Sequence, residues 1–191
     1  MLSWLLLAAL ILPGAARAEG ERLAETFLSI CADTFPDFAA MDAKAAALGG
    51  WLDPNPEKFS RVPFIWPDTA WVGTTGARDH IRDDDMKIER AKGTFSDLPA
   101  AGCEVTGRGK IDDAAMARLF GRLEPALYLG ERGSSLMNSQ TRSWLVQLDG
   151  QTAILAIIQP KMGGEIFATS IALVRLDETL IERWTAQGAA Q

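Results

Sequence analysis

The chain has 191 residues with a formal net charge of −6, and 48% of its residues are hydrophobic. That length is sufficient for one domain with a hydrophobic core of its own. Nucleic acids and anionic membranes are bound through basic surfaces, so the acidic balance argues against both as partners.

Residues 1–18 have the pattern of a secretory signal peptide. An apolar run ends at Leu12, Pro13-Gly14 follows as a helix breaker, and Ala16-Arg17-Ala18 places small residues where signal peptidase reads them. The run is shorter than the roughly 20 apolar residues that span a bilayer. We therefore expect a periplasmic or secreted protein that begins at Glu19, has no transmembrane segment and, having lost one arginine, carries a net charge of −7.

Two helices are predicted at the start of the mature chain. Apolar residues recur at helical spacing from Glu19 to Phe35, and Pro36 interrupts that pattern. Asp37 can cap a second, alanine-rich helix that ends at Gly49-Gly50.

The chain has two cysteines, Cys31 and Cys103. An even pair in an exported protein is most simply a disulfide, here closing a loop of about 73 residues and contributing roughly 4 kcal/mol in the chain-entropy model. The alternative, a catalytic thiol, usually needs a histidine partner, and His80 is the only histidine.

Residues 51–70 combine four prolines with several aromatic residues, so an irregular segment is expected there. One hypothesis makes Trp51, Trp66 and Trp71 a binding surface that stacks on a sugar ring or anchors a protein partner. The other hypothesis folds these indoles inward, where they would cover one face of a sheet.

Short strands are predicted at residues 71–75, 86–92 and 101–106. A charged stretch between the first two contains His80, Asp83 and Asp85, which form a candidate metal or acid–base site. Neighbouring residues point in alternating directions, however, so a solvated charged turn is the simpler interpretation and no metal is expected.

The second half begins with a predicted helix from Asp112 or Asp113 to about Leu123, and residues 126–141 resemble a surface loop. Residues 143–148 and 151–159 form a hairpin around an Asp149-Gly150 turn, with a third strand at residues 165–176 and a last helix at residues 177–185. The continuous apolar run at residues 154–158 indicates a central strand covered on both faces.

These elements predict a single α+β domain over residues 19–191, with an antiparallel sheet and helices mainly on one face. The sequence contains no evident internal repeat, nucleotide-binding glycine motif or serine-hydrolase motif. We therefore expect no catalytic residue and no cofactor.

The layout of an early helical Cys31, Gly50-Trp51 and a mid-chain Cys103 resembles small uncharacterised exported proteins of alphaproteobacterial type. The resemblance covers roughly residues 27–106. It implies a periplasmic location and a disulfide, and it supplies no activity.

Two functions remain as hypotheses. The first is a non-catalytic periplasmic binding or interaction domain whose partner is a protein or an envelope component. The second is an envelope-acting hydrolase that uses a pair of carboxylates. The carboxylates considered for the second are Glu124, Glu131, Asp149, Glu165 and the run at residues 83–85.

Overall fold

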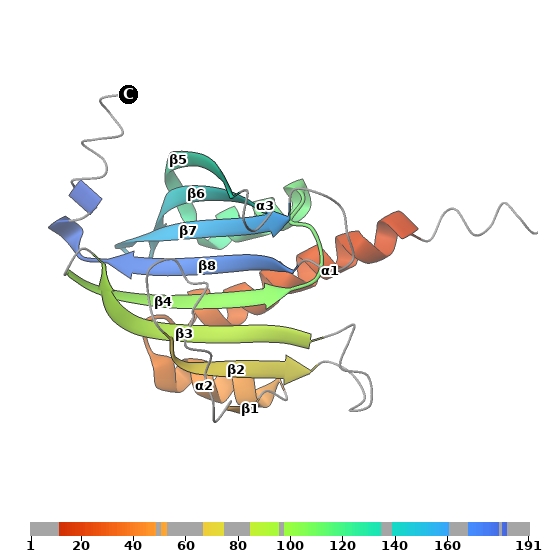
Figure 1. Ribbon diagram of the computed structural model, residues 1–191, viewed down its shortest axis with the longest axis horizontal. Coiled ribbons are helices and arrows are strands. Elements are labelled where there is room, and N and C mark those ends of the chain that lie inside the picture. Colours follow the sequence, from red (N-terminus) through yellow and green to blue (C-terminus); the bar gives the residue numbers. More distant parts are fainter. Residues whose placement is uncertain are drawn as a thin grey trace, which may run out of the picture.

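Figure 1 shows the computed structural model of the chain, which describes residues 12–48, 51–52, 67–74, 85–95, 98–134, 139–160, 168–179 and 181–182. Its helices lie together behind one broad sheet. The helical elements are α1 (Leu12–Phe27), the π-helix η1 (Leu28–Ala32), α2 (Phe38–Ala47) and α3 (Asp113–Arg122). This arrangement confirms the α+β class and the helices on one face.

Eight described strands form a single antiparallel sheet in the order β1-β2-β3-β4-β8-β7-β6-β5. Their bounds are β1 Trp51–Leu52, β2 Pro67–Thr74, β3 Asp85–Phe95, β4 Leu98–Gly107, β5 Glu124–Ser134, β6 Ser139–Leu148, β7 Gln151–Pro160 and β8 Thr169–Leu176. The last strand of the sequence, β8, lies in the middle of the sheet, between β4 and β7.

The order of elements repeats itself within the chain. A helix followed by a four-stranded meander occurs first as α2 with β1–β4 and then as α3 with β5–β8. The two meanders join where β4 pairs with β8, and Cys103 lies opposite Leu173 in that pair. The sequence shows no such repeat, because the same topology can be built from quite different side chains.

The main hydrophobic core fills the space between the helices and the sheet. Buried side chains on this side come from every helix and from the central strands, and each large aliphatic or aromatic one contributes about 1.5–3 kcal/mol. Fully buried examples are Phe27, Met41, Val105, Leu119, Leu155 and Leu173. Residues 153–157 of β7 are all buried, which confirms the prediction of a strand covered on both faces.

Local signals explain where the helices begin and end. Asp37 and Asp112 cap α2 and α3 by accepting hydrogen bonds from backbone N–H groups of the first turn, at 3.0–3.1 Å. The helical stretch predicted from Glu19 to Phe35 is present as α1 and η1, and it ends before Pro36. Pro13-Gly14, expected to break a helix, instead lies in the first turn of α1, where proline is tolerated.

α1 meets the rest of the protein closely at Gly20, two residues beyond the predicted cleavage point. A Cβ added at Gly20 would lie 2.1 Å from the carbonyl oxygen of Lys110, and one at Gly109 would lie 2.5 Å from the Gly20 nitrogen. Two glycines therefore let the backbone of α1 touch the segment after β4. Within the described residues, no helix is both long and apolar enough to cross a membrane.

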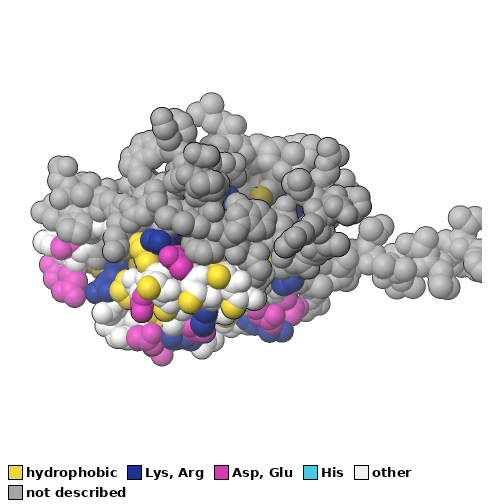
Figure 2. All heavy atoms as spheres, turned by 90° about the horizontal axis from the view of Figure 1, so that it is seen from below, with side chains coloured by type: hydrophobic (Ala, Val, Ile, Leu, Met, Phe, Trp, Pro, Cys, Tyr) yellow, Lys and Arg dark blue, Asp and Glu magenta, His cyan; other side chains and the backbone are white. Residues whose placement is uncertain are grey.

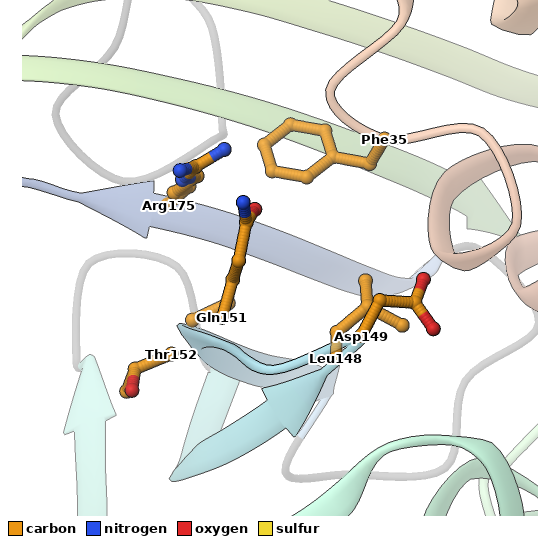
Figure 3. Close-up of a pocket in the computed structure, with 7 residues that line it drawn as sticks. Phe35, Leu148, Asp149, Gln151, Thr152 and Arg175 are labelled. Carbon is orange, nitrogen blue, oxygen red and sulfur yellow. The ribbon is translucent and has the colours of Figure 1, made fainter.

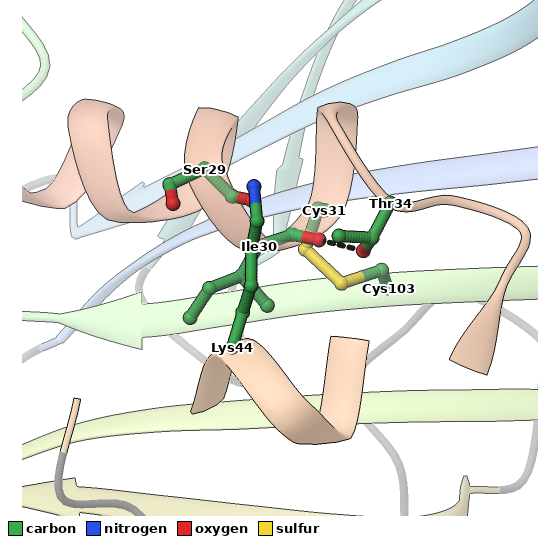
Figure 4. The surroundings of a disulfide bond; sticks show 6 residues. All are labelled: Ser29, Ile30, Cys31, Thr34, Lys44 and Cys103. Atoms are coloured by element: carbon green, nitrogen blue, oxygen red, sulfur yellow. Dashed lines mark hydrogen bonds between the residues drawn. A yellow bond between two sulfur atoms is a disulfide. The ribbon is translucent and has the colours of Figure 1, made fainter. Parts of the chain in front are cut away.

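The expected disulfide is present and joins the helical layer to the sheet. Cys31 in η1 bonds to Cys103 in β4 across a sequence separation of 72, with 5.6 Å between their Cα atoms (Figure 4). Around it, the Thr34 hydroxyl donates to the carbonyl of Ile30, and Lys44 Nζ of α2 donates to the Ser29 carbonyl at 2.8 Å. Both cysteines are fully buried, so the bond is a structural one.

Two sequence predictions need correction. Residues 126–141 are not a loop: they belong mostly to β5 and β6, so the final meander has four strands instead of three. The segment from residue 51 to residue 70 is not irregular at its ends, because β1 and the start of β2 fall within it. The hairpin is correct, and positive φ angles of 50° at Asp149 and 78° at Gly150 confirm its primed turn.

Candidate functional site

Five polar side chains occupy the centre of the sheet on the face away from the helices. Lys87 and Glu89 of β3, Glu104 and Thr106 of β4, and Ser170 of β8 alternate with core residues along their strands, and we call them the buried polar cluster. Glu89 lies directly opposite Glu104, with exposed fractions of 1% and 0%. Two adjacent carboxylates in a protein interior are unusual, because desolvation disfavours their charged forms.

Hydrogen bonds and one ion pair connect the buried polar cluster. Thr106 Oγ1 donates to Glu104 Oε1 at 3.1 Å and lies 2.8 Å from Ser170 Oγ. Lys87 Nζ lies 3.0 Å from Glu89 Oε1, and its side chain is 26% exposed. Only this lysine reaches the surface, so a ligand outside the fold cannot touch the carboxylates in this conformation.

A second group of side chains extends from the core to the surface at the edge of the sheet. Tyr128 of the edge strand β5 lies opposite Trp144 of β6, with ring centroids 5.3 Å apart. Trp144 meets Phe120 of α3 edge-on at 5.5 Å, and the guanidinium carbon of Arg142 lies 5.7 Å from the Trp144 centroid. We call these four residues the aromatic shelf. Tyr128 is 51% exposed, whereas Trp144 beneath it is 9% exposed.

Planar polar groups border the aromatic shelf on the same face of the sheet. Glu131 lies opposite Arg142 in the β5–β6 pair, and Gln140 Nε2 donates to Glu131 Oε1. Arg142 Nη2 donates to Gln159 Oε1 of β7 at 3.1 Å. The Gln159 Nε2 group is buried and has no acceptor among the described residues.

Sequence reasoning missed both groups of residues. Glu89 and Glu104 lie within short strands that the sequence predicts correctly. The alternation of Lys87 and Glu89 with apolar residues is the signal that places both side chains on the face opposite the core. Tyr128, the only tyrosine of the chain, was assigned to a loop. Had β5 been recognised as a strand, its pairing with β6 would have placed Tyr128 against Trp144.

The predicted aromatic surface lies largely outside the described residues. Trp51 pairs with Val72 and Trp71 with Leu52, so the backbones of these two tryptophans lie on neighbouring strands β1 and β2. Their side chains and the whole of Trp66 are outside the described part of the chain.

Most of the polar site predicted around His80 also lies outside the described residues. His80 and Asp83 lie outside the described residues, and Asp85 is the first residue of β3. Within the described ranges, no three His, Cys, Asp or Glu side chains are grouped so that they can hold a metal ion.

The carboxylates expected for a hydrolase are differently placed. Glu124 and Glu131 are exposed near opposite ends of β5, and Glu165 lies outside the described residues. Asp149 receives a bidentate pair of hydrogen bonds from Arg122, at 3.1 and 3.0 Å. These hydrogen bonds hold the pKa of the exposed Asp149 carboxyl below its ordinary range and raise the pKa of Arg122.

A small cavity lies where the β6–β7 hairpin meets the turn after η1. It has a volume of about 30 Å³, and the side chains of Phe35, Gln151 and Arg175 converge on it, whereas the Asp149 carboxylate points away (Figure 3). This volume admits a water molecule, but pockets for small organic ligands have about 300–1,000 Å³. The cavity is therefore no ligand site of that size.

Charged side chains of both signs are interspersed over the described surface seen from below (Figure 2). Ion pairs also connect elements of the fold. Arg118 of α3 pairs with Glu21 and Glu25 of α1, and Arg90 of β3 makes a bidentate pair with Asp42 of α2 at 2.8 and 2.9 Å. The Arg90 pair therefore joins α2 to the sheet, the Arg118 pairs join α3 to α1, and none of these pairs involves a residue of the aromatic shelf.

Comparison with protein families, with curated proteins and with solved structures found no match.

Proposed function

We propose that the mature chain is a non-catalytic binding domain of the periplasm or the extracellular space, and that the aromatic shelf is its contact surface. The exposure of Tyr128 carries this proposal. Large aromatic residues are usually buried on folding, yet Tyr128 is 51% exposed, and its ring lies 5.3 Å from that of Trp144, which is itself buried. Tyr and Trp combine an apolar ring with a polar group, which suits a surface that contacts both apolar and polar parts of a ligand.

Export is supported by three observations. The apolar run and the Ala16-Arg17-Ala18 sequence have the signal-peptide pattern, and the Cys31–Cys103 disulfide suits an oxidising compartment. The resemblance to small exported proteins agrees with this location. The intact mass of the exported protein should correspond to a chain that starts at Glu19, and a retained leader would contradict it.

The binding function can be tested without knowing the ligand. Isotope-labelled mature protein would be titrated with size-fractionated periplasmic extract while the backbone amide resonances are followed. We expect one fraction to shift resonances of β5 and β6, and Tyr128→Ala to abolish the shift. Leu127→Ala is the matched control, because Leu127 is 42% exposed and pairs with Leu145 on the other face of the sheet. Shifts confined to other elements, or none with any fraction, would refute the proposal.

A second candidate function, hydrolysis of an envelope glycan, is favoured by the direct pairing of Glu89 with Glu104. Side chains directly opposite each other in an antiparallel pair have Cβ atoms about 4.5–5.5 Å apart, so the two carboxyl groups are near enough to act together, as the carboxyl pair of a glycosidase does. Because the described structure buries both groups, this function also requires the sheet face to open. Turnover of cell-wall glycan that is lost in both Glu89→Gln and Glu104→Gln would establish hydrolysis and overturn the non-catalytic proposal.

A further inference from the structure

We infer that the ligand of the aromatic shelf is a saccharide, with one pyranose ring lying on the open face of Tyr128 and its hydroxyl groups bonded to the polar residues alongside. This inference rests on the proposed binding function and specifies the chemistry of the ligand.

The register of the strands places the required groups on one surface. Tyr128 pairs with Trp144, Glu131 with Arg142, and Gln140 with Gln159, so all six side chains share the helix-side face. The pairs follow one another along the strands, which sets the planar polar groups next to the aromatic ring. The Trp144 ring lies against Tyr128 with an angle of 43° between the ring planes, and Tyr128 remains 51% exposed to a ligand.

The polar groups match the hydrogen-bonding needs of neighbouring hydroxyls, each of which donates and accepts. Arg142 has five N–H donors and uses one on a described residue, Gln159. The Glu131 carboxylate is exposed and accepts one hydrogen bond, from Gln140, so further acceptor positions remain. Arg142 and Glu131 have opposite charges, so the surface favours a neutral sugar over a strongly charged one.

The apolar content of the surface argues against a protein as the main ligand. A stable protein interface buries about 800 Å² on each partner around a cluster of apolar anchors. The exposed large hydrophobic residues of the described structure are Leu48, Leu127 and Tyr128. Leu48 follows α2, and Leu127 faces the other side of the sheet. One ring among polar planar groups suits a sugar, whose faces are apolar and whose rim is polar.

The test uses mature, oxidised protein and two neutral trisaccharides, chitotriose and maltotriose, in titrations followed by amide resonances and by tryptophan fluorescence. We expect at least one to bind in the millimolar to high-micromolar range and to shift resonances of β5 and β6. Tyr128→Ala should weaken binding about tenfold or more, as removal of an aromatic stacking surface does for other ring ligands. Tyr128→Phe should keep the affinity, and Arg142→Gln should weaken it about threefold to tenfold.

Leu127→Ala is again the control, and it should bind as the wild type does. Equal loss of affinity in Leu127→Ala and Tyr128→Ala would overturn the inference, as would an unchanged affinity in Tyr128→Ala. If neither sugar shifts the shelf resonances while an extract fraction does, the saccharide inference is wrong and the binding function stands. If neither sugar nor any extract fraction shifts them, both are wrong.

Discussion

Removal of the disulfide should destabilise the protein by an amount that the loop length sets. Cys31 and Cys103 are separated by 72 residues, and the chain-entropy model assigns a loop of that size about 4 kcal/mol. Single domains are stable by only about 5–15 kcal/mol, so the bond accounts for a large share of the total. For a domain of this size, the melting temperature should fall by roughly 8–16 °C.

The measurement is a urea titration of oxidised mature protein in four forms: wild type, Cys31→Ala, Cys103→Ala and the double variant. Either single substitution already removes the bond. The double variant should therefore lose about as much free energy of unfolding as each single variant, and far less than the sum of the two single losses. Both cysteines are fully buried, so the small packing losses on substitution with alanine should be comparable at the two positions.

Two results would contradict this reasoning. Additive costs of the two single substitutions would mean that each cysteine contributes separately, without a bond between them. A free-energy loss below about 1 kcal/mol would mean that the loop is already restricted in the unfolded chain. Thiol titration of the unfolded, unreduced protein provides the direct control, because the bond leaves no free thiol among the two cysteines of the chain.

Three further substitutions test other contacts by urea unfolding or titration. Gly20→Ala should lower the free energy of unfolding by about 1–3 kcal/mol, because the added Cβ would lie 2.1 Å from a backbone oxygen. The control Gly121→Ala in α3, where nothing lies within 4 Å of the added Cβ, should raise it by up to about 1 kcal/mol. Equal effects of the two substitutions would contradict the close contact at Gly20. Thr106→Val removes hydrogen bonds of 3.1 and 2.8 Å and should lower the free energy of unfolding by about 1–3 kcal/mol. Thr106→Ser keeps the hydroxyl group and should therefore retain most of that stability. Hydrogen bonds from Arg122 lower the pKa of Asp149, so their stabilisation is present at neutral pH and is lost as the pH falls through that lowered pKa. A carboxyl titration by NMR should show the midpoint rise in Arg122→Gln, and an unchanged midpoint would refute the pairing.

Elements with strong local signals could be predicted from the sequence. Asp37 and Asp112 cap their helices as expected, and Asp149-Gly150 forms the expected turn. The disulfide followed from the number of cysteines together with the export signal. In each case the deciding chemistry lies within a few residues or follows from a simple count.

β5 could not be predicted in this way. Pro125, Gly130 and Gly133 are residues typical of loops, and they interrupt the apolar alternation of the segment. The strand forms because β6 supplies a partner along its length, and its register shifts, between Pro125 and Leu127 and between Tyr128 and Gly130, accommodate the irregular residues. At the edge of a sheet proline is tolerated, since only one side of the strand needs hydrogen bonds.

The buried polar cluster was hidden for a different reason. Glu89 and Glu104 are 15 positions apart, and glutamate on a short strand normally faces water. Only the β3–β4 register shows that they lie side by side, and only the tertiary structure shows that this face is buried.

The position of β8 has a consequence for how the protein is made. β8 pairs with β4 on one side and β7 on the other, so β4 and β7 each remain an open edge until residues 169–176 are available. Open strand edges are templates for pairing with other chains. A chain that crosses a membrane from its N-terminus onward would therefore carry an unfinished sheet for most of its passage. Folding factors on the far side should matter most during that interval, and truncation just before β8 should yield aggregates, even though every helix of the core is present.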